Sequence, residues 1–249
     1  MSTTTNFYAP PSAIQGSRVA LPAEEARHAR AVLRVSTGDR LTVVDGEGGW
    51  YRVDVQHARK EQVVGTIVET RQAVGEPSVN VTVGLGLLKK RNRFETFVEK
   101  AVELGVRRVV PLRTAHTETD RFRRERVRKK MVAALKQCRR SRLPTLESPR
   151  PFHDVLDDRT AGRQFICHGE GPAQTLHGAL QERPGPESVL ILVGPEGGFH
   201  EDEVDAARAA GCTAVSLGPR RLRAETAGLL AVAAAVHGTG ANERTAPNV

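Results

Sequence analysis

Short apolar segments recur from residue 79 onward, and they alternate with stretches that have helical periodicity. Uniformly apolar runs of this length are typical of strands buried on both faces of a parallel sheet. Their alternation with helices builds an α/β domain. The expected strands are Val79–Gly84, Arg108–Leu112, Gln164–Cys167, Val189–Val193 and Ala214–Leu217. The pattern therefore predicts a parallel-sheet α/β domain over residues 73–249.

Three helices are expected within this domain, at Asn92–Leu104, His200–Ala210 and Glu225–His237. Asn92 and Glu95 have the spacing of a capping box at the start of the first helix. Gly105 and Gly211 follow the first and second helices, where a glycine can adopt the left-handed conformation that ends a helix. The helix boundaries are thus predicted from local chemistry alone.

Residues 1–72 have a different pattern, with alternating apolar and polar positions typical of half-buried strands. These expected strands are Arg40–Val44, Trp50–Val55 and Val63–Val68. Gly46, Gly48 and Gly49 mark the turn between the first two, and Pro22–Leu33 is the one expected helix. A small β-barrel is the natural closure for such a unit. Gly75 and Pro77 interrupt the pattern and place the boundary after residue 72.

The composition of the chain indicates the cellular compartment in which it works. With 39% hydrophobic and 27% charged residues, the sequence has no apolar run that approaches the roughly 20 residues of a membrane helix. The N-terminus lacks the basic and then apolar pattern of a secretory signal. Three cysteines, Cys138, Cys167 and Cys212, are too few and too scattered for a disulfide framework or a zinc site. We expect a cytoplasmic protein without a structural metal.

Positive charge is concentrated in one stretch of the sequence. Residues Arg113–Arg150 hold 13 Lys and Arg against four Asp and Glu, so they account for the whole net charge of +8. Such a concentration favours a surface for a polyanion, because neutralisation of phosphates drives nucleic-acid binding. The alternative is an ordinary solvated helix face. The stretch predicts one basic patch that contacts RNA or DNA.

Two glycine-rich loops, Gly194–Phe199 and Leu217–Ala227, each follow an expected strand and precede an expected helix. This is the edge of a parallel sheet where α/β folds bind ligands, and we expect the two strand ends to be adjacent. The loops lack the endings of a P-loop and of a dinucleotide fingerprint. Each could be a plain turn, and Glu225 could merely cap a helix. Arg223, however, is of the kind that binds a carboxylate, a phosphate or a base edge.

The two loops read GPEGGF and LGPRRLRAETA, and this pair resembles the motifs of the SPOUT superfamily, in particular of the RsmE-type ribosomal RNA uridine N3-methyltransferases. Further matching segments are His28 with Val32–Arg34 and Gly38–Asp39, Phe94–Glu95 with Glu99–Val106, and Gln137–Cys138 with Arg142–Pro144. The resemblance covers nearly the whole chain. The chain departs from the family pattern at Arg113–Glu118 and at Lys136.

The resemblance implies a PUA-like β-barrel followed by an α/β domain with a trefoil knot, which holds S-adenosylmethionine, in a homodimer. It implies methylation of N3 of a specific uridine in 16S ribosomal RNA of the small subunit. By position in the motifs, the cofactor would contact Leu85, Leu87, Val193, Gly194, Pro195, Glu196, Gly197, Leu217, Gly218, Leu222 and Ala227.

The same motifs supply candidate catalytic and RNA-binding residues. Arg223 would stabilise the uracil oxyanion, and Glu196 or Glu225 would orient the base or accept its proton. We expect the target base to be extruded from its stack into the site. The RNA contacts expected are His28, Arg30, Arg34, Lys89, Arg93, Arg139, Arg142 and Arg221. A solvated polar face is the alternative for His28, Arg30 and Arg34.

Two other functions remain open at this point. A non-catalytic RNA-binding assembly factor would keep the basic stretch and the barrel, but it would not need the two glycine-rich loops. Another SPOUT methyltransferase, acting on a transfer RNA base or on a ribose 2′-hydroxyl, would keep the loops but should lack the pattern from His28 to Asp39. Binding of S-adenosylmethionine distinguishes the enzyme from an assembly factor. Mapping of the modified nucleoside distinguishes a uridine N3-methyltransferase from another SPOUT methyltransferase.

Overall fold

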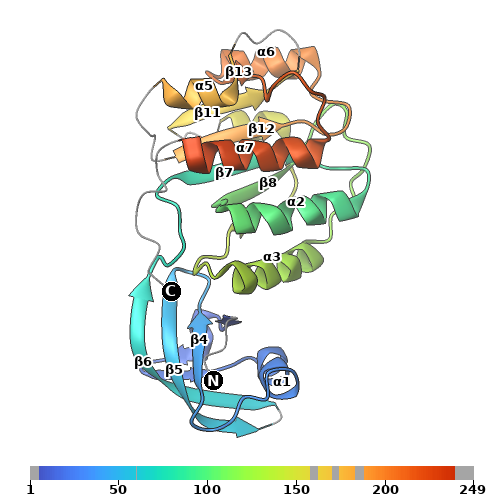
Figure 1. Ribbon diagram of the computed structural model, residues 1–249. Helices are drawn as coiled ribbons and strands as arrows, with labels where there is room; N and C mark the ends of the chain where they lie inside the picture. Colours follow the sequence, from blue (N-terminus) through green and yellow to red (C-terminus); the bar gives the residue numbers. More distant parts are fainter. Residues whose placement is uncertain (1–5, 60, 158–161, 170–173, 183–187, 239–249) are drawn as a thin grey trace. The chain divides into compact units, whose positions relative to one another are not determined.

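The computed structural model describes residues 6–59, 61–157, 162–169, 174–182 and 188–238 (Figure 1). The chain divides into two compact units, one of Met1–Glu76 with Val132–Leu143 and the other of Pro77–Met131 with Pro144–Val249. The division after Glu76 lies close to the boundary expected after residue 72. The inclusion of Val132–Leu143 in the first unit was not expected, and it places the second division within helix α3 (Arg124–Cys138).

The first unit is built on a six-stranded sheet with the strand order β1-β4-β5-β6-β3-β2. Its elements are β1 (Phe7–Tyr8), a 3-10 helix (Pro11–Ala13), β2 (Ile14–Gln15), β3 (Arg18–Ala20), α1 (Ala23–Ala31), β4 (Arg40–Val44), β5 (Gly49–Arg59) and β6 (Gln62–Gln72). Neighbouring strands are antiparallel except for the parallel pair β1 and β4. Register shifts in β5 at Arg52/Val53 and Val55/His57 bend the strand. The sheet curls as the PUA-like prediction requires.

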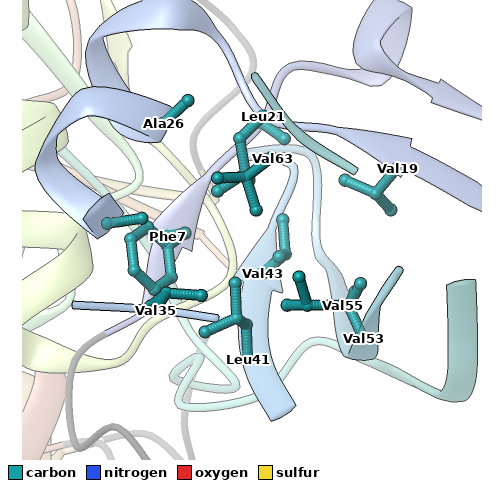
Figure 2. Packing of buried hydrophobic residues seen from close by; sticks show 12 residues of the cluster. Phe7, Val19, Leu21, Ala26, Val35, Leu41, Val43, Val53, Val55 and Val63 are labelled. Carbon is teal, nitrogen blue, oxygen red and sulfur yellow. The ribbon is translucent and has the colours of Figure 1, made fainter. Parts of the chain in front are cut away.

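One apolar core fills the inside of this curled sheet (Figure 2). Leu41 and Val43 from β4 and Val53 and Val55 from β5 are at most 3% exposed, and they occupy alternate positions of their strands. Phe7 packs beside them with 1% exposure. The alternation seen in the sequence therefore corresponds to one buried face of a sheet.

The segment Val132–Leu143 is attached to the first unit by buried charges. The Glu76 carboxylate lies 2.7 Å from Nη2 of Arg140 and accepts hydrogen bonds from the backbone N–H groups of Ser141 and Arg142. Nζ of Lys136 donates to Glu25 at 2.7 Å. The prediction of one basic patch over Arg113–Arg150 is wrong for Arg140, which is 3% exposed and pairs with Glu76. The stretch is divided between the two units.

Replacing Glu76 by alanine should lower the free energy of unfolding of the first unit by about 3–5 kcal/mol, because it leaves the Arg140 guanidinium buried without this carboxylate. Urea unfolding followed by the fluorescence of Trp50 measures this, since the single tryptophan lies in the first unit. The matched control is Glu69→Ala, whose carboxylate is 32% exposed and should cost about 1 kcal/mol or less. Equal effects of the two substitutions would contradict the role given to Glu76.

The second unit contains a seven-stranded parallel sheet with the order β10-β8-β7-β12-β11-β13, and β9 pairs with β8. Its strands are β7 (Asn80–Gly86), β8 (Arg108–Arg113), β9 (Thr145–Leu146), β10 (Arg150–Pro151), β11 (Arg163–Cys167), β12 (Ser188–Val193) and β13 (Thr213–Val215). All five expected strands are present, which confirms the parallel α/β fold. The expected strand Ala214–Leu217 is too long at its end, because β13 stops at Val215.

Helices cover both faces of this sheet. The helices of this unit are α2 (Arg91–Leu104), α4 (Phe152–Leu156), α5 (Leu176–Gln181), α6 (Glu201–Ala209) and α7 (Ala224–Gly238), together with the first part of α3. Helices α2 and α7 pack against each other, and α7 lies over β7 and β12 (Figure 1). Helices α4 and α6 share a core with alternate residues of β8, β11 and β12. None of the described helices combines the length and apolar character needed to cross a membrane.

The expected capping box at Asn92 is wrong. Helix α2 begins one residue earlier, at Arg91, and its N-cap Lys90 makes no side-chain capping bond. Glu95 instead pairs with Arg126, with 2.7 Å between Nε and Oε1. The Glu95 carboxylate, which the local pattern assigned to the helix cap, therefore forms a tertiary ion pair instead. The predicted end of α2 is confirmed, because Gly105 follows the helix and has the left-handed φ of 104°.

Candidate functional site

The loop after β12 is a tight turn that only glycine permits at its first position. Gly198 N–H donates to the Pro195 carbonyl at 3.0 Å, and Gly198 has φ of 75°. A Cβ on Gly194 would lie 2.7 Å from the backbone carbon of Gly198. Likewise, a Cβ on Gly86, at the end of β7, would lie 2.5 Å from Pro195. The glycines therefore fold the loop tightly on itself and against the end of β7.

The loop after β13 turns at Gly218, which has φ of 107° and whose N–H donates to Oγ of Ser216 at 3.1 Å. The expectation that the two loops follow adjacent strands is wrong, because β11 lies between β12 and β13. The loops nevertheless meet, since the second one continues to α7 and brings Leu222 and Ala227 to the same pocket as Val193.

This pocket has a volume of about 400 Å³. It is lined by Arg93, Val193, Gly194, Pro195, Glu196, Arg221, Leu222, Arg223, Ala224 and Ala227. Both loops and helix α2 thus contribute. The structure brings together the expected cofactor residues Val193, Gly194, Pro195, Glu196, Leu222 and Ala227. The remaining expected residues, Leu85, Leu87, Gly197, Leu217 and Gly218, are not among the lining.

Arg93 connects two of the expected catalytic carboxylates. Its Nη1 lies 3.8 Å from Oε1 of Glu196, and its Nε lies 3.6 Å from Oε1 of Glu225. The other oxygen of Glu225, Oε2, is buried and has no hydrogen-bond partner among the described residues. A buried acceptor of this kind is costly unless a ligand or water satisfies it. Glu225 is not among the residues that line the pocket, but Arg93 links it to Glu196, which is.

Arg223 lies on the rim of the same pocket and is exposed. Within the described part of the chain, its guanidinium makes no hydrogen bond or ion pair. Arg221 is also exposed on this rim. A guanidinium free of internal partners has all its donors available for an anionic group that enters the pocket.

The other expected RNA contacts are dispersed. In the first unit the His28 ring packs at an angle of 62° on Phe7, the Arg30 side chain donates to the Val35 carbonyl, and Arg34 is exposed. Arg139 is exposed with φ of 62°, whereas Arg142 is half-buried. In the second unit Lys89 pairs with Glu118 at 2.7 Å. Their contact with RNA stays a prediction.

Two supports of the first loop were missed at the sequence level. Glu203 is 5% exposed; its Oε2 accepts from the His200 N–H at 2.9 Å and its Oε1 from the Ala115 N–H at 2.8 Å. His200 and Glu203 form the capping box of α6. Nδ1 of His116 lies 3.3 Å from the Gly198 carbonyl oxygen. The glutamate three residues after His200 was the available signal, but histidine is not a usual capping residue.

Comparison with known proteins agrees with this arrangement. Residues 75–236 match the model of the RNA methyltransferase domain, and residues 21–68 match the RNA methyltransferase PUA domain. The chain is 30% identical to ribosomal RNA small subunit methyltransferase E of Synechocystis, over 90% of this chain and 74% of that one. It is 27% identical to the Bacillus subtilis protein of the same name, over 85% and 86%.

Solved structures give the same result. The Neisseria gonorrhoeae ribosomal RNA small subunit methyltransferase E, bound to S-adenosyl methionine, superimposes with a TM-score of 0.82 and 28% identity, over 93% of this chain and 96% of that one. A Legionella pneumophila protein in complex with the same cofactor gives a TM-score of 0.79 at 26% identity, over 92% and 96%. The chain belongs to the ribosomal RNA small subunit methyltransferase E family, with a PUA-like unit followed by an RNA methyltransferase domain.

Proposed function

We propose that this protein transfers the methyl group of S-adenosylmethionine to N3 of a uridine in 16S ribosomal RNA. The observation that carries the proposal is the pocket shared by the two glycine-rich loops and Arg93, which is lined by the Glu196 carboxylate and by Arg223, whose guanidinium makes no ion pair with any described residue. Membership of an RNA methyltransferase family and a relative that holds S-adenosyl methionine support the choice of cofactor and of RNA.

The residues of the pocket fit such a cofactor. Its volume of about 400 Å³ lies in the range of roughly 300–1,000 Å³ typical of small-molecule sites. Val193, Leu222, Ala224 and Ala227 offer apolar surface for a flat ring. The Glu196 carboxylate in the lining suits the positive charge of a sulfonium and an amino group.

The chain's own residues then divide the work. S-adenosylmethionine supplies a methyl group activated by its sulfonium. Arg223 on the rim stabilises the negative charge that develops on the uracil oxygens as N3 loses its proton. Glu196 or Glu225 accepts that proton, directly or through a water. Arg93 lies within 4 Å of both carboxylates and is a positioning residue, because it links Glu225, which is outside the lining, to Glu196 in the pocket.

Arg93→Met should lower kcat by roughly tenfold to a hundredfold, because both carboxylates lose the cation that orients them. The Km for RNA should change much less if Arg93 acts through the carboxylates. Lys100→Met is the matched control on the same helix, where the exposed lysine pairs with Glu103 outside the pocket. Steady-state kinetics of both variants test this. A change confined to the Km for RNA would instead return Arg93 to the role of an RNA contact.

The proposal includes features that the family resemblance implies, namely a homodimer, a trefoil knot in the second unit, and work on the small subunit in the cytoplasm. Light scattering of the purified protein tests the dimer. Calorimetry with S-adenosylmethionine tests the cofactor: we expect binding at one site per chain. No binding to the intact protein would refute the enzyme and leave an RNA-binding assembly factor.

A further inference from the structure

A second hollow in the same unit, with a volume of about 630 Å³, lies beside the start of α2 and apart from the cofactor pocket. Two of its lining residues are acidic and six are basic: Lys89, Lys90, Arg91, Arg121, Arg123 and Arg126. We refer to it as the basic hollow. In the basic hollow these six residues lie around one site, whereas the basic stretch of the sequence is defined only by its composition.

Both carboxylates of the basic hollow are already engaged. Glu118 pairs with Lys89 at 2.7 Å, and Glu95 pairs with Arg126 at 2.7 Å. The other four basic residues are Lys90, Arg91, Arg121 and Arg123. All four are exposed, and none has an ion-pair partner within the described part of the chain. The hollow thus carries an excess of four positive charges that none of the described residues neutralises.

This excess is energetically unfavourable in the free protein. Four like charges repel one another around one hollow. Lys90 and Arg91 also stand at the N-terminal end of α2, whose first turn holds no acidic residue and whose dipole disfavours cations there. A bound polyanion would relieve both effects. The charge is therefore better explained by a ligand than by the stability of the unit.

The basic hollow is connected to the cofactor pocket through one short segment. The Lys89 N–H approaches Oε2 of Glu196 at 3.4 Å, and Lys89 lines the hollow while Glu196 lines the pocket. Arg91 belongs to the hollow and Arg93, in the same helical turn, to the pocket. An anionic chain held in the hollow would therefore place an adjoining group at the mouth of the pocket.

We infer that the basic hollow binds the phosphodiester backbone of the RNA strand that carries the target uridine. Lys90, Arg91, Arg121 and Arg123 contact phosphates, and the neighbouring nucleotide is presented to Arg223 and the cofactor. This inference rests on the proposed function and names the surface that holds its substrate. It assigns the hollow to backbone contacts, which position a nucleic acid without reading its sequence.

The test compares two double variants, Lys90→Ala/Arg91→Ala and Arg121→Ala/Arg123→Ala, in the full chain. Binding of a 16S ribosomal RNA transcript is measured by fluorescence anisotropy at several salt concentrations. Each pair should weaken binding about tenfold or more, and the slope of log K against log salt should become shallower by about 1–2. The control Lys129→Ala/Arg208→Ala removes two exposed basic residues outside the hollow and should change neither quantity.

Calorimetry with S-adenosylmethionine accompanies each variant and separates the possible failures. Unchanged RNA affinity and salt slope in both double variants, with cofactor binding intact, would overturn the basic hollow and leave the proposed function standing. If the unsubstituted protein did not bind S-adenosylmethionine, the proposed function itself would be refuted. A third result would be that the substitutions abolish binding of millimolar inorganic phosphate but leave RNA binding unchanged. This would indicate a site for a small phosphorylated molecule and would also overturn the inference.

Discussion

Arg223→Ala should reduce the rate of methyl transfer by roughly a hundredfold to a thousandfold, the usual effect of losing one group that stabilises a developing oxyanion. The side chain lines the cofactor pocket, is exposed, and has no partner within the described residues, so its removal should leave the fold intact. Single-turnover methylation of 16S ribosomal RNA measures the rate, and circular dichroism checks the fold.

Arg220→Ala is the matched control for this substitution. Arg220 is an exposed arginine of the same loop, but it does not line the pocket. The control should keep at least half of the rate of the unsubstituted protein. If Arg223→Ala were also to keep near-normal turnover, the role proposed for Arg223 would be wrong, and Arg221 on the same rim would be the next residue to test.

Gly194→Ala should weaken the binding of S-adenosylmethionine by roughly tenfold to a hundredfold. The added Cβ would lie 2.7 Å from the carbonyl carbon of Gly198 and 3.0 Å from the backbone nitrogen of Phe199, so the turn that lines the pocket must open. Forcing a methyl group into a packed site typically costs about 1–3 kcal/mol. Calorimetry gives the dissociation constant.

Gly169→Ala serves as the control for this glycine, since no heavy atom of the described residues, its chain neighbours aside, lies within 4 Å of the position that its Cβ would take. Cofactor affinity should be unchanged in that variant. Unchanged affinity in Gly194→Ala as well would show that the turn does not shape the cofactor pocket. Gly197 is less informative, because its Cβ would meet the His116 side chain at 2.9 Å and it does not line the pocket.

The parallel sheet could be predicted from the sequence because its strands are buried on both faces. Strands such as β12 therefore consist of uninterrupted apolar residues that few other structures explain. Strands β9 and β10 could not be predicted, because each has only two residues and a segment that short shows no periodicity. The order of strands was also beyond prediction, since hydrogen bonding between β11 and both of its neighbours is a tertiary property.

Local charge patterns were less informative than apolar ones. Arg140 was expected on a basic surface, but its partner Glu76 is distant in the sequence and only the fold brings them together. Arg93 was likewise expected to contact RNA, and the structure places it between Glu196 and Glu225. A charged side chain takes its role from long-range neighbours, so composition could indicate an anionic ligand but not the residues that hold it.

The proposed reaction can be assayed on small subunits from cells lacking this protein, with purified protein and isotope-labelled S-adenosylmethionine. After nuclease digestion, mass spectrometry identifies the labelled nucleoside and its position. The structure and the family lead us to predict one labelled N3-methyluridine per small subunit. Label on a ribose 2′-hydroxyl or on another base, or no incorporation by protein that binds the cofactor, would contradict the proposed reaction.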